Sequence, residues 1–227
     1  MCGRFSLTTD EQRLNEFFRL AGGDEPYVPR YNGAPTQNLA VITGDDTTKL
    51  RYFRWGLIPS WAKELPRSSP VINARVESLG EKPMFRRLIA RQRCLVPADG
   101  FYEWVRAGKK QAYRFVMADG FPFAMAGLWD AWKSPEGSIL RSFAIVTTEA
   151  NELMKPIHDR MPVILEKDHY KAWMGETDEK LLRMLLRPFP GDRMKAYRVS
   201  DRVNKVTAEG PDLIKPQAEP DLFSTDF

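Results

Sequence analysis

The second residue of the chain is a cysteine, and this position gives it chemistry that an internal cysteine lacks. Initiator methionine is usually excised before a small residue, so loss of Met1 would leave Cys2 with a thiol and an α-amine on adjacent carbons. The α-amine has a pKa of roughly 7.7–8.0, so part of it is neutral near physiological pH. An aldehyde can form a Schiff base with this amine, which the thiol then traps as a five-membered thiazolidine. Retention of Met1 would block this chemistry, and Cys2 would then be only a small residue beside the start codon.

Two other residues could transfer protons. His158 lies in KPIHDRMPVIL, and the second histidine, His169, lies in a charged stretch, so His158 is the main candidate near pH 7. Its neighbours Asp159 and Arg160 could set its charge or bind phosphate, or the imidazole could be satisfied structurally in a loop. Glu103 lies among aromatic residues in DGFYEWV. It is either a solvated, outward-facing residue or a partly desolvated acid with a raised pKa.

An amide and a guanidinium alternate in the segment INARVES. Asn73 and Arg75 are two residues apart, so both face the same side of an extended segment. They could position a nucleophile and a phosphate, or they could form a surface hydrogen-bonded pair. Cys94 lies in the apolar run RCLVPADG, which predicts a buried and unreactive thiol.

The net charge of +4 conceals an uneven distribution. Residues 49–114 hold 15 Lys and Arg against 5 Asp and Glu, a local net charge of +10, so the rest of the chain carries −6. Basic residues interleaved with aromatic residues suit a single-stranded nucleic acid, because phosphates pair with cations and bases stack on rings. The aromatic residues could equally belong to the core. Those in this segment are Trp55, Trp61, Phe85, Phe101, Tyr102, Trp104 and Tyr113.

Composition excludes several classes of protein. The chain has 227 residues, of which 43% are hydrophobic and 28% charged, as is typical of a soluble globular protein. Its mean hydropathy is −0.44, with no apolar run near the roughly 20 residues of a membrane span and no apolar leader at the start. Two cysteines and two histidines leave little for disulfides or metal, and no phosphate-binding loop, dinucleotide fingerprint or metalloprotease motif occurs. We therefore expect no cofactor, no metal and no membrane contact.

The apolar pattern predicts strands more often than helices. Short apolar runs separated by turn residues predict a largely antiparallel sheet or barrel; they are NLAVIT, KLRYFRWGLIP, RCLVPADGFYEW, QAYRFVM, FAMAGLW and SILRSFAIVT. A first helix is expected to open at a capping box formed by Thr9 and Gln12 and to end at Gly22-Gly23. Further short helices are predicted at 81–91, 149–155, 167–174 and 177–187.

These elements predict one compact α+β domain. It would span residues 1–214 and be built around a barrel-like, mostly antiparallel β-sheet with peripheral helices. Residues 215–227 contain prolines and are net acidic, which predicts a flexible C-terminal tail.

Six motifs in order resemble the SOS-response-associated peptidase family. They are MCGRF at the start, YNGAP at 31–35, WGLIPSW at 55–61, INARVE at 72–77, CLVPADGFYEW at 94–104 and IHDRMPV at 157–163. The resemblance covers residues 1 to about 214. One departure is Gly33, where the family pattern usually reads Asn-Val-Ala-Pro; a missing side chain there could loosen the loop, although Asn32 and Pro35 remain.

The resemblance implies a sensor of abasic sites in single-stranded DNA. Cys2, freed of Met1, would form a thiazolidine with the ring-opened aldehyde of an abasic deoxyribose, making a covalent DNA–protein crosslink that shields the lesion. Asn73 would hold the neighbourhood of Cys2 by hydrogen bonding. Glu103 would act as acid and base near the amine, and His158 would assist ring opening and later reversal of the crosslink.

The resemblance also implies a DNA-binding surface. Arg4, Arg75 and Arg160 match positions that grip phosphates. Trp61 and Pro35 match positions that hold or kink the strand near the lesion, and Asn32 lies in the same matching motif as Pro35. The family name further implies an autopeptidase that releases Met1, alongside the lyase-like crosslinking. A monomer in the bacterial cytosol, associated with the nucleoid, is expected.

Two alternatives remain open. Class II glutamine amidotransferases also begin Met-Cys-Gly and use an N-terminal cysteine against an amide, but they usually carry a synthetase domain, for which 227 residues leave no room. The second alternative is a non-covalent single-stranded DNA-binding module in which Cys2 has no chemical role.

Overall fold

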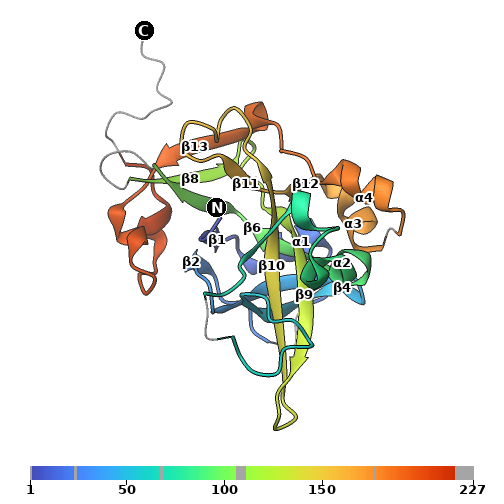
Figure 1. Ribbon diagram of the computed structural model, residues 1–227. Helices are drawn as coiled ribbons and strands as arrows, with labels where there is room; N and C mark the ends of the chain where they lie inside the picture. Colours follow the sequence, from blue (N-terminus) through green and yellow to red (C-terminus); the bar gives the residue numbers. More distant parts are fainter. Residues whose placement is uncertain (1, 23–24, 67–68, 106–110, 176, 218–227) are drawn as a thin grey trace.

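The larger of two β-sheets closes into a barrel in the computed structural model, which describes residues 2–22, 25–66, 69–105, 111–175 and 177–217 (Figure 1). β10 (Ile139–Glu149) pairs with β4 (Asp46–Trp55), and β4 pairs with β3 (Asn38–Thr43). β3 pairs with β6 (Arg93–Ala98), β6 with β9 (Phe123–Lys133), and β9 returns to β10. Three short strands extend this ring: β5 (Asn73–Arg75) and β11 (Arg160–Pro162) beside β10, and β12 (Ile164–Leu165) beside β9.

The second sheet brings the amino terminus into the core. Its order is β13 (Met194–Arg198), β8 (Ala112–Met117), β7 (Gly100–Trp104), β1 (Phe5–Leu7) and β2 (Arg30–Gly33), with every pair antiparallel. Because β1 is paired on both edges, the residues just before it are held between distant parts of the chain. Only the pairings of β10 with β4 and β5 are parallel among the described strands. The prediction of an α+β domain around a barrel-like, mostly antiparallel sheet is confirmed.

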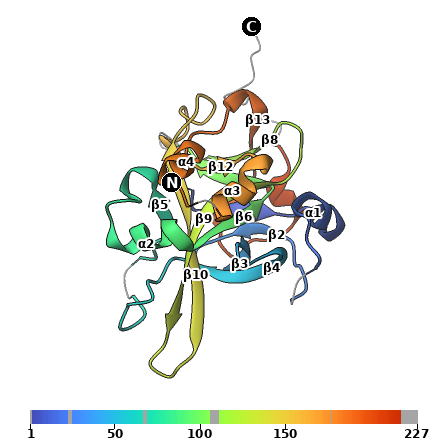
Figure 2. The ribbon, with the colours of Figure 1, turned by 90° about the vertical axis from the view of Figure 1, so that its right-hand side faces the viewer.

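The helices are short and lie outside the sheets (Figure 2). The α-helices are α1 (Glu11–Phe18), α2 (Pro83–Arg91), α3 (Tyr170–Gly175) and α4 (Glu179–Leu185). The 3-10 helices are η1 (Val76–Ser78), η2 (Lys167–His169), η3 (Gly191–Arg193), η4 (Asp201–Asn204) and η5 (Pro211–Ile214). No helix within the described ranges is long and apolar enough to cross a membrane.

Two helix predictions are wrong. α1 is capped by Asp10, whose Oδ1 accepts from Arg13 N at 2.9 Å, whereas Thr9 N donates to the Asp99 carboxylate. The helix ends at Phe18 with Arg19 in the left-handed region, several residues before Gly22; Gly23 lies outside the described residues. Residues 149–155 form the end of β10 and a series of turns. Asn151 Oδ1 accepts from Met154 N at 2.9 Å and Asn151 O from Lys155 N at 3.0 Å, as at a helix start, but Pro156 disfavours the helical conformation at Lys155 and the turn is not continued.

The aromatic residues of the basic segment mostly form the core. Trp55, Phe85, Phe101, Tyr102 and Tyr113 are buried, which confirms the alternative that assigned them to packing. Alternate residues of β4 and β10 point into the barrel, where the rings of Trp55 and Phe143 stack with centroids 6.2 Å apart. Trp61 differs, since 67% of its surface is exposed.

The predicted boundary at residue 214 stays a prediction. Gln217 N still donates to Arg198 O at 3.0 Å, which attaches the start of the predicted tail to β13. Residues 218–227 of that tail lie outside the described part of the chain.

Candidate active site at the amino terminus

Cys2 lies in the core of the molecule, with 0% of its surface exposed. It precedes β1 and packs in the same cluster as Phe5 and Phe101, which pair across β1 and β7. Burial raises the pKa of the Cys2 thiol, and the negative charge of Glu103 raises it further. The thiol is therefore neutral at physiological pH and cannot react as a free thiolate without a base.

Asn73 connects Cys2 to the molecular surface. Its Nδ2 donates to the Cys2 carbonyl oxygen at 3.0 Å, and its position is fixed because β5 runs parallel to β10 with Asn73 opposite Ile145. The Asn73 Oδ1 atom is buried and makes no hydrogen bond to any of the described residues. Asn73 thus holds the backbone of Cys2 and keeps one acceptor available beside it.

Glu103 is buried on β7 and is close enough to Cys2 to influence its thiol. Its strand is antiparallel to β1, with Phe101 opposite Phe5, so the register carries Glu103 toward the amino terminus. Of the two alternatives for this carboxyl group, the desolvated one describes its environment.

His158 is buried just before β11 and has two competing partners. Its Nδ1 accepts a hydrogen bond from Arg160 N at 2.9 Å and also lies 2.9 Å from Asp159 Oδ1. An unprotonated Nδ1 can accept from the Arg160 backbone N–H, and a protonated Nδ1 can donate to the Asp159 carboxylate, so Nδ1 has a partner in either protonation state.

A surface pocket of about 710 Å³ opens beside Asn73. It brings together three of the predicted site residues, Asn73, Arg75 and the exposed Trp61. Asn73 and Arg75 do face one side of a strand, with Ala74 buried between them. The complete lining is Trp61, Val71, Asn73, Arg75, Ser78, Lys82, Pro83, Met84 and Phe85. The cations and aromatic rings suit an anionic ligand that carries flat rings.

Arg160 lies at the edge of this region but already holds a carboxylate. Its Nη1 donates to Glu77 Oε1 at 2.6 Å and its Nη2 to Glu77 Oε2 at 3.1 Å. Nη2 also donates to the Thr147 carbonyl oxygen at 2.7 Å. Neither Glu77 nor Thr147 was selected from the sequence; Glu77 is part of INARVE, but nothing in that motif indicates a partner 83 residues away.

Arg4 and Asn32 are buried and bonded to each other. Arg4 Nη1 donates to Asn32 Oδ1 at 2.8 Å and to Val203 O at 2.9 Å. Asn32 Nδ2 donates to the carbonyl oxygens of Lys205 and Ala208 at 2.9 and 3.0 Å. Both side chains thus anchor η4 and the segment that follows it. The phosphate contact of Arg4 and the DNA contact of Asn32 stay predictions.

The loop around Gly33 is more tightly packed than the sequence suggests. Gly33 belongs to β2, and a Cβ there would meet Leu39 Cδ1 and Phe5 O, both at 3.2 Å. Leu39 therefore occupies the space that a side chain at position 33 would fill. Pro35 lies half-buried in the turn that follows, next to Thr36 with its positive φ of 73°.

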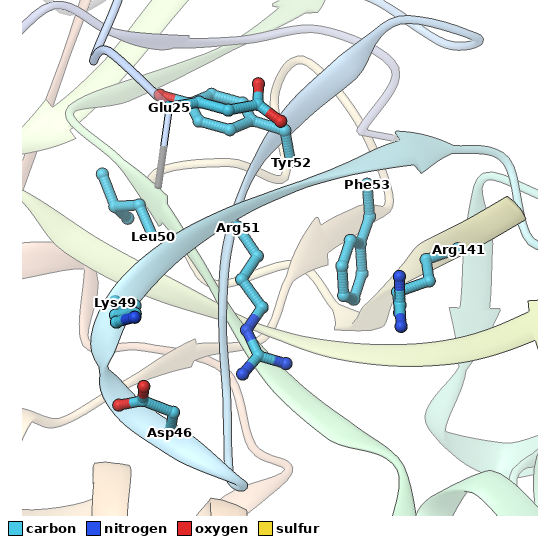
Figure 3. Close-up of a pocket in the computed structure, with 8 residues that line it drawn as sticks. All are labelled: Glu25, Asp46, Lys49, Leu50, Arg51, Tyr52, Phe53 and Arg141. Atoms are coloured by element: carbon cyan, nitrogen blue, oxygen red, sulfur yellow. The ribbon is translucent and has the colours of Figure 1, made fainter. Parts of the chain in front are cut away.

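A second pocket, of about 400 Å³, lies toward the other end of the barrel (Figure 3). Arg51 and Phe53 project from the same side of β4, and Arg141 lies at the start of β10, six residues before Thr147. Three cations line the pocket, but Asp46 and Glu25 also line it, and Arg51 pairs with Asp45 at 2.7 Å. The charges largely cancel, and none of the residues selected from the sequence lies here.

Fold and site together define a class of protein: a one-domain α+β barrel in which the cysteine at position 2 is held by the amide of Asn73 and lies near the buried carboxyl group of Glu103. The model of the SOS response associated peptidase (SRAP) family matches residues 1–206, and the chain belongs to this family. Within the described residues no group of three or more His, Cys, Asp and Glu could hold a metal ion.

Relatives of known name and a solved structure agree with this assignment. The chain is 43% identical over 222 residues to the abasic site processing protein YoqW of Bacillus subtilis, covering 95% of this chain and 99% of the relative. It is 34% identical over 226 residues to the abasic site processing protein YedK of Escherichia coli, covering 95% of this chain and 100% of the relative. A crystal structure of a protein from Bacteroides thetaiotaomicron superposes with a TM-score of 0.81 at 26% identity, covering 95% of this chain and 100% of that one.

Proposed function

We propose that this protein processes abasic sites in single-stranded DNA by forming a thiazolidine crosslink through Cys2. The observation that carries the proposal is Asn73, which bonds the Cys2 carbonyl and also lines the pocket that contains Arg75 and Trp61. A strand bound in that pocket would bring a sugar to the amino terminus. Relatives that cover nearly the whole chain are named abasic site processing proteins, which supports the same substrate.

The reaction needs no oxidant and no cofactor. The α-amine of Cys2, exposed by removal of Met1, attacks the C1′ aldehyde of the ring-opened abasic sugar, and loss of one water gives a Schiff base. The thiol sulfur then bonds to the same carbon, and the imine nitrogen gains the proton that the thiol loses. The product contains both reactants less one water.

The environment of the thiol supports a role for Glu103 in proton transfer. A neutral thiol must lose its proton as the carbon–sulfur bond forms, and the Glu103 carboxylate is the charge that acts on it. Glu103 accepts this proton and returns it to the nitrogen, as a general base and then an acid. His158, which has a partner for Nδ1 in either protonation state, assists opening of the sugar ring and later reversal of the crosslink.

The remaining selected residues hold the strand. Arg75 and Arg160 bind phosphates by charge-assisted hydrogen bonds, and Trp61 stacks on a base next to the lesion, with Pro35 beside the kinked backbone. The same site releases Met1 as an autopeptidase. The protein acts as a monomer in the bacterial cytosol, at the nucleoid.

A denaturing gel tests the proposal. A uracil-containing single strand is treated with uracil glycosylase and incubated with the wild type, Cys2→Ala and the matched control Cys94→Ala. The wild type and the control, which lacks the other buried thiol, should give a band that survives heat and detergent, and Cys2→Ala should give none.

Three outcomes would contradict the proposal. Crosslinking of Cys2→Ala at the wild-type rate would remove Cys2 from the reaction. A shift seen only on native gels would favour a non-covalent DNA-binding module. Turnover of free glutamine without DNA would favour an amidohydrolase.

A further inference from the structure

The guanidinium of Arg160 forms a bidentate ion pair with the exposed carboxylate of Glu77. Both oxygens of Glu77 bond the guanidinium, at 2.6 and 3.1 Å. The Arg160 side chain is only 14% exposed and is also held by the Thr147 carbonyl at 2.7 Å, whereas the Glu77 side chain is 61% exposed. A rotation of Glu77 into solvent would leave the guanidinium in place, with two donors directed outward.

Glu77 lies between two cations of the same surface. It belongs to η1, which directly follows β5, so it is two residues from Arg75. The hydrogen bonds from Arg160 hold the pKa of Glu77 below its usual value, and the charge of Arg75 contributes in the same direction. The carboxylate therefore stays ionised and neutralises part of the charge that the pocket presents.

A phosphate can replace this carboxylate with little rearrangement. Carboxylate and phosphate both accept two parallel N–H bonds from a guanidinium. The exchange conserves the hydrogen bonds of Arg160 and returns Glu77 to water. A single-atom anion such as chloride offers no bidentate match and displaces Glu77 poorly.

We propose that Glu77 is an internal competitor of the DNA backbone, which occupies the phosphate-binding fork of Arg160 until a strand displaces it. The inference rests on the proposed function only in taking single-stranded DNA as the ligand. Glu77 thereby lowers the affinity of the site for undamaged single strands, which form no covalent bond with Cys2.

The test measures affinity for an undamaged strand by fluorescence anisotropy. Glu77→Gln keeps the shape of the side chain and removes its charge, and it should bind a labelled oligothymidylate roughly three- to tenfold more tightly than the wild type at low salt. The difference should shrink as salt rises, because salt screens the charge of the Glu77 carboxylate, which is 61% exposed. Equal or weaker binding by Glu77→Gln would overturn the proposal, since Glu77 would then be neutral or would position Arg160.

Two controls separate competition from net charge. Glu166 forms another bidentate pair, with Arg193, in a pocket lined by Phe17 and Phe121. Glu166→Gln removes one negative charge there and should leave the affinity for the strand within twofold of the wild-type value. In an Arg160→Ala background the gain from Glu77→Gln should disappear. Persistence of the gain in that background, or an equal gain from Glu166→Gln, would contradict competition for Arg160.

The crosslinking gel distinguishes the two proposals. Affinity for an undamaged strand does not depend on Cys2 chemistry. If the wild type fails to crosslink but Glu77→Gln binds the undamaged strand more tightly, only the proposed function is rejected. If the wild type crosslinks normally but Glu77→Gln does not bind more tightly, only the competition by Glu77 is rejected.

Discussion

At the scale of single residues, the chemistry of Cys2 follows from its position in the sequence, but its burial does not. An amino-terminal aminothiol is predictable from the second codon, and the resemblance to a family supplies an aldehyde as its target. Complete burial results from the pairing of β1 with β2 and β7, whose residues lie some 30 and 100 positions away. The contact with Asn73 joins residues 71 apart, and no local pattern indicates it.

The raised pKa of the Cys2 thiol determines how crosslinking depends on pH. A raised pKa keeps the thiol protonated through neutral and mildly alkaline pH, so the group that titrates there is the α-amine. The crosslinking rate at saturating DNA should rise with pH and level off above about pH 8. A rate that keeps rising tenfold per pH unit beyond pH 9 would show that the thiolate is the limiting species.

Asn73 should affect the reaction more than binding. Asn73→Ala removes the hydrogen bond to the Cys2 carbonyl and frees the amino terminus to move, so single-turnover crosslinking should slow by about 10- to 100-fold. Affinity for an undamaged strand should change by less than threefold. Ser78→Ala, which alters the same pocket without touching Cys2, is the matched control and should crosslink at the wild-type rate. Equal losses of rate and affinity would show that Asn73 binds DNA.

At the scale of elements, strands were easier to predict than helices. Apolar runs between turn residues identified most of the barrel strands, because a short continuous apolar run bounded by turn residues is typical of a strand that is buried on both faces. The predicted helix at 149–155 is absent because Glu149 still belongs to β10 and Pro156 stops the single turn that begins at Asn151, whose Nδ2 donates to Phe189 O at 2.7 Å. Burial of Arg4 and Asn32 depends on the segment after η4, at the opposite end of the chain, and local sequence carries no sign of it.

Asn32 should act mainly on stability. Asn32→Ala leaves the buried Arg4 without one acceptor and removes the side-chain donor to the carbonyls of Lys205 and Ala208, of which that of Lys205 keeps the Ala208 N–H. The free energy of unfolding should fall by about 2–4 kcal/mol in urea denaturation. The exposed Asn38→Ala should change it by less than about 0.5 kcal/mol. Unchanged stability with a large loss of DNA affinity would instead show that Asn32 contacts the strand.

At the scale of the whole molecule, the two ends of the barrel differ in the charged residues that line their pockets. Arg75, paired opposite Thr147 near the end of β10, lies at the end with the candidate site, and Arg141 lies near the start of the same strand. Arg141 and Thr147 are six positions apart on β10, and at a rise of about 3.4 Å per residue the two regions are roughly 20 Å apart. The excess of positive charge in residues 49–114 can be counted in the sequence. Which of these cations lie at which end of the barrel depends on how the strands close into it, and the sequence does not show that.

Salt dependence should separate the two ends. Arg75→Ala should weaken binding to an undamaged single strand and lower the slope of log affinity against log salt by about 0.7, the value for one phosphate contact. Arg51→Ala, at the other end and already paired with Asp45, should leave the slope unchanged. Equal effects of the two variants would show that binding follows net charge alone.

Intact mass spectrometry of the protein incubated with a single strand containing one abasic site tests the central claim most directly. We expect one adduct, stable without any reducing agent, whose mass is that of the chain lacking Met1 plus the oligonucleotide less one water. Replacement of Cys2 by alanine should abolish it. An adduct that retains Met1, or one that appears only after borohydride reduction, would contradict the thiazolidine at Cys2.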